Sequence, residues 1–468
     1  MTTLSVFLDV PKSIKGKVEQ QEEAYLKDGN RRKIFLGQRV LLSEDGQPWV
    51  PLPVKRVYLQ IVNDPTRNYE HLPVTGAPEY IRGVTEFALG KNSKAILQNR
   101  ASGVQTPGTT GAFRLGAKFL HRWYNINKKT SVCIAQLAYD RYRCLFEAAG
   151  LTNICPYRFW DNKNMGLALP EMLEDLEKSP DFSIVVLPTS CNPTGIQLSS
   201  SDWKQIADVM KRKSMFPFFH LKDQGLASGD VDTDAWPVRY FVSEDFELFC
   251  AQSFSASFGL YGERIGNLLI VLRSNDILIS VRSQLESLAH EVWSTPPCVG
   301  SRVVATVLNN PSFYMEWKAS LKMVVRRLMI IREKTREKLR LLESLKSWEH
   351  ITKQAGPFAF LGLTSSQVDI LAKKRHIYLP ECGQMNISGL NANNLDYVAQ
   401  SVHDVTMNDD LSCSSFAENY LEYTLSNMYS KMVSLESTGH PSASIQNVTN
   451  HLNAGEQKPN RSSDPKGQ

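Results

Sequence analysis

The middle of the chain alternates short apolar runs with segments of helical spacing. The apolar runs are residues 182–187, 216–219, 247–252 and 267–272. Between the first two, residues 199–213 have apolar side chains at helical spacing and begin with Ser and Asp, which cap helices well. Apolar strands separated by helices are buried on both faces, so the pattern predicts an α/β fold with a mostly parallel sheet. Ligands of such sheets bind beyond the carboxyl ends of the strands.

A long amphipathic helix is predicted from Leu321 onward, because apolar residues then step by three or four as far as Leu345. Its other face is basic and contains Arg326, Arg327, Arg332, Lys334, Arg336, Lys338 and Arg340. Glu333 and Glu337 lie three positions before Arg336 and Arg340. The pattern therefore favours a solvated, ion-paired face over a basic binding surface.

The remaining segments suggest four parts. Short strands are expected at 358–363, 376–379 and 385–388, and a closing helix near 393–405. We predict an N-terminal arm that joins a smaller domain (1–46), a large domain (47–320), the rest of the smaller domain (321–405) and a tail (406–468). Residues 415–435 have helical spacing, whereas 437–468 are too polar to bury a core and are expected to be disordered.

Composition narrows the functional class. The 468 residues carry a net charge of only +5, which argues against a dedicated nucleic-acid surface. No run of residues is long and apolar enough to predict a membrane span. The eight cysteines lack paired spacing and are interpreted as reduced, buried thiols. The N-terminus does not have the pattern of a secretory or mitochondrial leader sequence. Together these features predict a cytoplasmic protein.

Several motifs occur together in a specific order. They are Asn-Pro-Thr-Gly at 192–195, Phe-Cys-Ala-Gln-Ser-Phe-Ser at 249–255, Phe-Gly-Leu-Tyr-Gly-Glu-Arg-Ile-Gly at 258–266, Trp-Ser-Thr-Pro-Pro at 293–297 and Asn-Ile-Ser-Gly-Leu at 386–390. In this order and spacing the chain resembles a cytosolic aspartate aminotransferase, a class I pyridoxal-phosphate-dependent enzyme, from about residue 5 to 405. The resemblance implies fold-type I, with a seven-stranded, mostly parallel sheet in a large domain, a smaller α/β domain and a homodimer that shares its active sites. The reaction it implies is amino transfer between aspartate and 2-oxoglutarate.

Ala256 is the main departure from the resemblance. The family's motif has a lysine at this position, and its amine forms an imine with the cofactor and carries a proton between two carbons. A methyl group can do neither, and loss of the proton carrier alone costs ~10²–10⁴ in rate. The sequence therefore predicts that aspartate aminotransferase chemistry is lost.

Four further positions depart from the family's pattern. His220 stands where an aspartate would pair with the pyridine nitrogen, and Asp223 where a tyrosine would hold the phenolic oxygen. Gln384 and His290 replace two arginines that would clamp the substrate carboxylates, the second of them across the dimer interface. A guanidinium pairs with both oxygens of a carboxylate, which neither replacement reproduces.

Part of a cofactor cradle is retained. By resemblance, Asn192, Ser253, Arg264 and Thr110 could hold the phenolic oxygen and the phosphate, and Tyr139 could stack on the ring. Structural roles remain open for them: Asn192 as a turn cap, Ser253 as a backbone partner and Arg264 as the partner of a buried acid. The sequence leaves the binding of pyridoxal phosphate undecided and excludes an imine at residue 256.

Three nearby residues change the surroundings of the cradle. His71 replaces a tyrosine that would touch the phosphate, and Arg39 replaces a glycine at the mouth of the pocket. Lys222 lies two residues beyond His220 and could offer a replacement amine, although we favour a surface or loop lysine.

Three functions stay open from the sequence. The first is a pseudoenzyme that keeps the fold without the chemistry. The second is a weak or altered transaminase. The third is a regulatory subunit that pairs with an active relative in a heterodimer.

Overall fold

The computed structural model describes residues 5–13, 15–124, 130–190, 193–343 and 347–407. Residues 408–468 of the predicted tail therefore lie outside the described residues, as do Asn192, Cys191 and Cys413, whereas residues 406 and 407 still belong to the last helix. None of the helices in this described part has the length and hydrophobicity needed to cross a bilayer.

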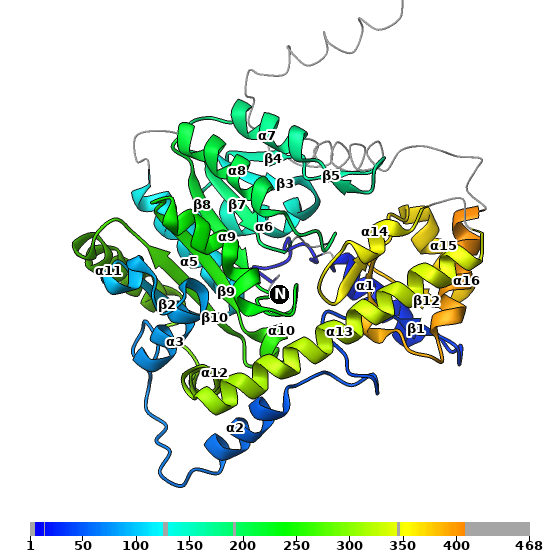
Figure 1. The fold of residues 1–468 in the computed structure, drawn as a ribbon, viewed down its shortest axis with the longest axis horizontal. Coiled ribbons are helices and arrows are strands. Elements are labelled where there is room, and N and C mark those ends of the chain that lie inside the picture. Colours follow the sequence, from blue (N-terminus) through cyan, green and yellow to red (C-terminus); the bar gives the residue numbers. More distant parts are fainter. Residues whose placement is uncertain (1–4, 14, 125–129, 191–192, 344–346, 408–468) are drawn as a thin grey trace, which may run out of the picture. The chain divides into compact units, whose positions relative to one another are not determined.

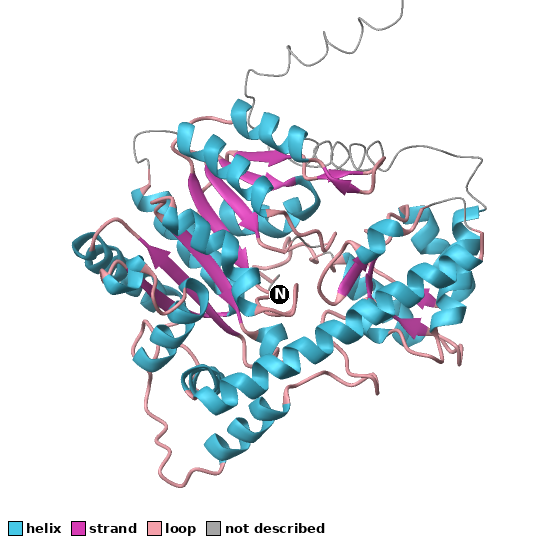
Figure 2. Cartoon of the chain, viewed as in Figure 1, coloured by secondary structure: helices cyan, strands magenta, loops and turns pink. Residues whose placement is uncertain are grey.

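A seven-stranded sheet forms the centre of the larger region (Figures 1 and 2). Its strands, in spatial order, are β2 (Ala101–Pro107), β10 (Ile265–Val271), β9 (Leu248–Ser253), β8 (Phe216–Leu221), β7 (Ile184–Pro188), β3 (Val132–Ala135) and β4 (Ile154–Tyr157). Strand β10 runs antiparallel to both neighbours, and the other pairs are parallel. The predicted mostly parallel, seven-stranded sheet is confirmed.

Helices cover both faces of this sheet. One face packs against α5 (Gly108–Trp123), α6 (Tyr139–Glu147) and α11 (Asn275–Val292), and the other against α7 (Leu169–Lys178), α8 (Ser200–Arg212) and α9 (Val231–Ser243). Successive residues of β8 alternate between the two cores: Phe218 belongs to the first and Phe219 to the second. This alternation sends His220 toward α5 and α6.

The remaining elements lie around this sheet and in a second region. Near the sheet are α2 (Leu52–Val62), α3 (Pro78–Leu89), α4 (Lys94–Leu97), α10 (Ser255–Phe258), α12 (Val299–Asn309) and the hairpin of β5 (Trp160–Asp161) with β6 (Gly166–Leu167). The second region contains α1 (Lys17–Lys27), β1 (Ile34–Phe35), α13 (Pro311–Leu341), α14 (Glu349–Thr352), β11 (Phe358–Phe360), α15 (Ser365–Arg375), β12 (Ile377–Tyr378), β13 (Gln384–Asn386) and α16 (Leu395–Met407). Strand β1 pairs with β12, and β11 pairs with β13.

Some local predictions are confirmed and some are wrong. Ser199 caps α8 in a capping box with Asp202, as its sequence predicts. Phe182 lies outside β7, because its φ of 60° is left-handed rather than extended. Cys144 is exposed, so the expectation that the thiols are buried is wrong there.

Helix α13 begins ten residues earlier than predicted. Asn310 caps it through its side chain, and Pro311 occupies the first turn, where a missing N–H is tolerated. Its basic face is ion-paired at Arg336 and Arg340, as expected. Arg332 contradicts this interpretation, because it is only 2% exposed and lies inside the second region.

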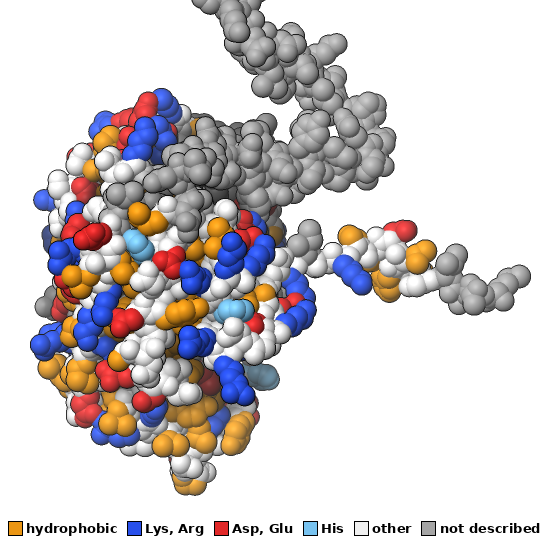
Figure 3. Space-filling view, turned by 90° about the vertical axis from the view of Figure 1, so that its right-hand side faces the viewer, with side chains coloured by type: hydrophobic (Ala, Val, Ile, Leu, Met, Phe, Trp, Pro, Cys, Tyr) orange, Lys and Arg blue, Asp and Glu red, His pale blue; other side chains and the backbone are white. Residues whose placement is uncertain are grey.

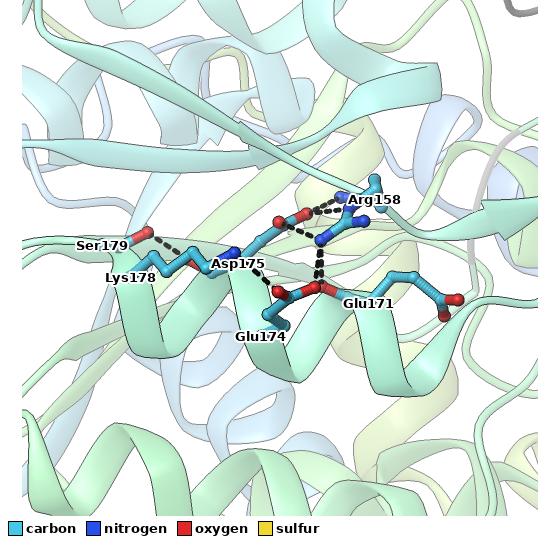
Figure 4. Close-up of polar contacts among 6 residues, drawn as sticks. All are labelled: Arg158, Glu171, Glu174, Asp175, Lys178 and Ser179. Carbon is cyan, nitrogen blue, oxygen red and sulfur yellow. Dashed lines mark hydrogen bonds and ion pairs between the residues drawn. The ribbon is translucent and has the colours of Figure 1, made fainter. Parts of the chain in front are cut away.

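Charges on the surface are mixed. On the face shown in Figure 3, Lys and Arg side chains lie among Asp and Glu side chains. A local example joins the segment after β4 to α7 (Figure 4). There Arg158 donates to both oxygens of Asp175, at 2.6 and 2.9 Å, and to Glu174 at 2.7 Å. Such a bidentate contact fixes geometry more than it adds stability on an exposed surface.

Asp28 gives the second region a pH-dependent tie. It follows α1 and accepts hydrogen bonds from the Asn30 N–H at 2.8 Å and the Tyr378 hydroxyl at 2.8 Å, and His376 Nδ1 lies 2.7 Å from the same carboxylate. The Asn30 N–H, followed by Tyr378 and His376, lowers the pKa of Asp28 from 3.8 to about 2. These contacts join the chain after α1 to β12.

We expect this tie to weaken in acid. Because the folded pKa lies below the unfolded one, the stabilisation is present above pH 3.8 and is lost as the pH falls toward 2. The urea midpoint should therefore fall more steeply with acid in the native chain than in Asp28→Asn. Tyr378→Phe, which removes one donor, should show an intermediate dependence. Parallel curves for all three proteins would contradict the assignment.

Candidate functional site

A cavity of about 570 Å³ lies at the carboxyl ends of the strands, between the large sheet and the second region. The larger region lines it with Gly108, Thr109, Thr110, Lys222, Asp223, Ser253, Ser255, Ala256, Tyr261 and Arg264. The N-terminal segment and the second region add Val18, Leu36, Gly37, Arg39, Pro357, Phe358, Pro380, Cys382 and Gln384. This is the position at which open α/β sheets bind ligands.

One end of the cavity is built to receive an anion. Helix α5 begins at Gly108, so its first N–H groups, including those of Thr109 and Thr110, have no partner within the helix. The positive end of the helix dipole points to the same place. Ser253, from the end of β9, and Arg264 line the cavity as well. These groups can hold a phosphate or another oxyanion.

Close backbone packing sets the shape of this end. A Cβ atom at Gly266 would lie 2.5 Å from the carbonyl carbon of Gly108, so a side chain there would displace the start of α5. Arg264 has a left-handed φ of 53°, which is unusual for a residue with a side chain. Its Nη2 lies 2.9 Å from the place where a Cβ at Gly108 would be. The guanidinium therefore lies directly beside the helix N-terminus.

Ala256 lies in the wall of the cavity. It belongs to the short helix α10, which follows β9 and ends at Gly259 in the left-handed conformation. Beneath α10, the indole of Trp317 donates to the carbonyl oxygen of Ser257 at 2.8 Å. The residue is thus held rigidly, and it presents only a methyl group to the cavity.

Lys222 and Asp223 form an ion pair inside the same cavity. Lys222 Nζ lies 3.0 Å from Asp223 Oδ2, and their side chains are only 15% and 7% exposed. Lys222 is therefore not a surface lysine, but it lies in the loop after β8, which agrees with the other half of the prediction, a loop lysine. The strand β8 ends at Leu221, so the alternation that would group Lys222 with His220 does not continue beyond it.

His220 lies away from the cavity lining. It is buried, and its Nδ1 is 2.6 Å from the hydroxyl oxygen of Tyr142 on α6. The edge of the ring also faces Phe113 on α5. The tautomer of His220 depends on whether its Nδ1 or the Tyr142 hydroxyl is the donor in this bond. His220, which stands where the resemblance implies an aspartate, therefore forms a buried pair with Tyr142.

The second region closes the cavity with groups of low charge. Gln384, at the start of β13, lines it, and its Nε2 lies 3.5 Å from the carbonyl oxygen of Pro193. Arg39 lies at the mouth, as predicted, and pairs with Glu19 at 3.3 Å on an exposed surface. Arg39 is therefore engaged outside the cavity rather than aimed as a free cation into it.

The structure leaves other predicted residues away from the cavity. His290, near the end of α11, and His71 are exposed, and neither lines it. His71 Nδ1 lies 3.2 Å from the hydroxyl oxygen of Thr295. Asn192 lies outside the described residues, and the side chain of Tyr139 is not among those that the structure describes.

Tyr261 and Ser255 line the cavity without having been singled out from the sequence. The Leu41 N–H donates to the Tyr261 hydroxyl at 2.9 Å, which joins the N-terminal segment to the cavity wall. Burial raises the pKa of Tyr261, and the nearby Asp223 carboxylate adds to the effect. Both residues belong to the motifs that contain Ser253 and Arg264. Their closeness in sequence to these two residues could have indicated that they line the same cavity.

The fold and this cavity define a class I or II aminotransferase. The chain matches the family described as aminotransferase class I and II over residues 32–402, and it belongs to that family. Within it, the chain is a divergent relative of the cytoplasmic aspartate aminotransferases. It is 45% identical over 403 residues to the cytoplasmic aspartate aminotransferase of Gallus gallus, covering 86% of this chain and 98% of that protein.

Solved structures agree with this assignment. The cytoplasmic aspartate aminotransferase of Saccharomyces cerevisiae superposes with a TM-score of 0.82 at 31% identity, over 86% of this chain and 98% of that one. An aromatic-amino-acid aminotransferase of Burkholderia pseudomallei, covalently bound to pyridoxal phosphate, gives a TM-score of 0.82 at 32% identity, over 86% and 100%. The predicted fold-type I architecture is confirmed.

Proposed function

We propose that this chain is a catalytically degenerate member of its family. It keeps the aspartate aminotransferase fold and an anion-binding cavity but does not exchange amino groups between aspartate and 2-oxoglutarate. The observation that carries the proposal is Ala256 in the cavity wall, where a methyl group can neither form an imine nor carry a proton. Gln384 in the same wall supports it, because an amide does not pair with both oxygens of a substrate carboxylate as a guanidinium does. Asp223 supports it as well, because it stands where the resemblance implies a tyrosine that would hold the phenolic oxygen of the cofactor.

Pyridoxal phosphate fits one end of this cavity and not the other. Thr110, Ser253 and Arg264 would hold its phosphate beside the start of α5. When bound in an active enzyme, the cofactor supplies an electron sink for reactions at the amino-acid carbon. Here no amine stands at residue 256, so we assign it no reaction step and propose reversible, non-covalent binding through the phosphate.

Replacing Ala256 by lysine tests both statements. Incubation with pyridoxal phosphate, borohydride reduction and mass mapping should give no adduct at residue 256 in the native chain and a stable adduct there in Ala256→Lys. Ala256→Met, which has similar length and no amine, is the matched control. In a coupled assay the native chain should transaminate aspartate at least ~10²-fold more slowly than an ordinary aspartate aminotransferase. Ordinary turnover by the native chain would overturn the proposal.

Lys222 supports a second candidate, a weak or altered transaminase. Lys222 lines the same cavity, so it would be the residue whose primary amine could hold the cofactor covalently in place of the missing lysine. In the structure this amine is engaged in the ion pair with Asp223, at 3.0 Å. The same borohydride experiment would place an adduct on Lys222 and remove it in Lys222→Met. A native chain without any modified lysine excludes this candidate.

We further propose that the chain forms a homodimer or pairs with an active relative. His290 is exposed on α11, where the resemblance implies a residue shared across a dimer interface. Size-exclusion chromatography with light scattering would give the oligomeric state. Co-expression of differently tagged chains would show whether hybrids form, and exclusive self-pairing would remove the regulatory-subunit version.

The division into domains at 1–46, 47–320, 321–405 and 406–468, and a cytoplasmic location, also remain proposals. The name of the Gallus gallus relative supports the location. Limited proteolysis would test the boundary before the tail, because a protected core ending near residue 406 is expected.

A further inference from the structure

A second cavity lies away from the candidate site, where α3, α4 and α11 meet the start of β2. Its volume is about 310 Å³, and it shares no lining residue with the first cavity. Among its lining residues are two arginines, Arg82 on α3 and Arg282 on α11. Nothing in the proposed function uses this place.

No carboxylate among the described residues forms an ion pair with either arginine. Within the described ranges, neither Arg82 nor Arg282 takes part in an ion pair within 4.0 Å. One carboxylate lines the cavity, that of Glu86, and it lies 4.0 Å from Lys91. The lining therefore carries an excess of positive charge, which an anion would offset.

Buried polar atoms at the cavity also lack partners. The Nε of Arg282 is buried without a hydrogen-bond acceptor among the described residues. The hydroxyl of Thr85, a residue only 5% exposed, has no partner there either. Most buried polar groups in folded proteins are hydrogen-bonded, so these two unpaired donors, both on residues that line the cavity, favour a polar occupant over an apolar one. An oxyanion can accept several hydrogen bonds at once, and a guanidinium presents a matching fork of donors.

The rest of the lining combines polar residues, among them Thr75, Asn99 and Ser102, with apolar ones. Ile81, Ile96 and Pro78 contribute to it, and the volume is at the lower end of the range of about 300–1,000 Å³ that is typical of small-molecule sites. A free inorganic ion would leave most of this space unfilled. The shape therefore suits a molecule with both an apolar body and an anionic group.

We propose that this cavity binds a small organic oxyanion, with its phosphate or carboxylate on Arg82 and Arg282 and its apolar part against Ile81 and Ile96. The site is separate from the cofactor cavity, so its occupancy does not depend on the proposed function. Binding there would join α3 to α11 and the start of β2.

Phenyl phosphate is a suitable probe, because it combines a ring with a phosphate. Isothermal titration of the full chain should show two sites, since the phosphate end of the first cavity also accepts the probe. Arg282→Met should weaken one site at least tenfold and leave the other. Arg264→Met should give the opposite pattern, and benzoate should follow phenyl phosphate at the second site.

Controls keep a folding defect apart from a binding defect. Arg82→Met, at an exposed position, should weaken the same site as Arg282→Met without changing the circular dichroism spectrum. A single site that disappears in Arg264→Met and is unchanged in both other variants would overturn the proposal. So would a change in self-association, rather than in probe binding, when Arg82 and Arg282 are replaced.

Discussion

Arg332→Met should lower the free energy of unfolding by about 3 kcal/mol, because it removes three buried hydrogen bonds at once. In the folded chain the Arg332 guanidinium donates to the carbonyl oxygens of Ile351 at 3.0 Å, Gly356 at 2.9 Å and Phe358 at 2.6 Å. Each carbonyl would lose this donor, and those of Ile351 and Gly356 would do so in buried surroundings. This expected loss is smaller than the summed contributions of three hydrogen bonds to a charged group. The reason is that burial already disfavours the charged guanidinium and lowers the pKa of Arg332 to about 9.

This clamp also shapes the candidate site. The loop it holds leads into β11, and Pro357 and Phe358 line the cavity. Urea denaturation measures the stability, and Arg340→Met on the same helix is the matched control. Arg340 is 64% exposed and pairs only with Glu337 among the described residues, so its loss should cost about 0.5 kcal/mol or less. Equal effects of the two changes would show that the buried contacts contribute no more than a surface pair.

The sequence predicted the parts of the fold that depend on local pattern. The apolar runs became β7, β8, β9 and β10, because a strand between two helical layers has no polar face. The motif order also placed Ser253, Ala256 and Arg264 in one cavity with Gln384, which is more than a hundred residues away. That long-range placement came from the family resemblance and not from periodicity.

What the sequence missed depends on contacts between distant segments. Arg332 looked like a solvated cation on a helix face, because the carbonyl groups that hold it belong to a loop that has no signature. Lys222 was predicted to be a surface or loop lysine, and the ion pair with Asp223 that accompanies its burial was not predicted, because Asp223 was interpreted only as a lost tyrosine. The packing of His220 against Tyr142 requires knowing which face of β8 meets α6. Each error concerns a polar group whose burial was decided by tertiary structure.

Asp234 supports the loop that follows the ion pair between Lys222 and Asp223. It lies on α9, is 6% exposed and accepts three backbone hydrogen bonds, from Gly225 at 2.7 Å, Ala227 at 3.1 Å and Ser228 at 3.0 Å. Asp234→Ala would leave these N–H groups without their acceptor, those of Gly225 and Ala227 in buried surroundings, and we expect a loss of about 3 kcal/mol. The same change should loosen the chain beside Asp223, so hydrogen exchange at residues 224–228 should speed up more than elsewhere.

Asp232→Ala on the same helix is the control for this prediction. Asp232 is 59% exposed and pairs with Arg239 at 2.9 Å, so its removal should cost less than about 1 kcal/mol. Burial raises the pKa of Asp234, and the N–H donors offset only part of that effect. Because the folded pKa is the higher one, the Asp234 contribution falls as the pH rises from 3.8, and Asp234→Asn should remove that slope. If Asp234→Ala and Asp232→Ala unfold at the same urea concentration, the carboxylate does not hold the loop, and the position of the cavity's ion pair must be fixed by β8 alone.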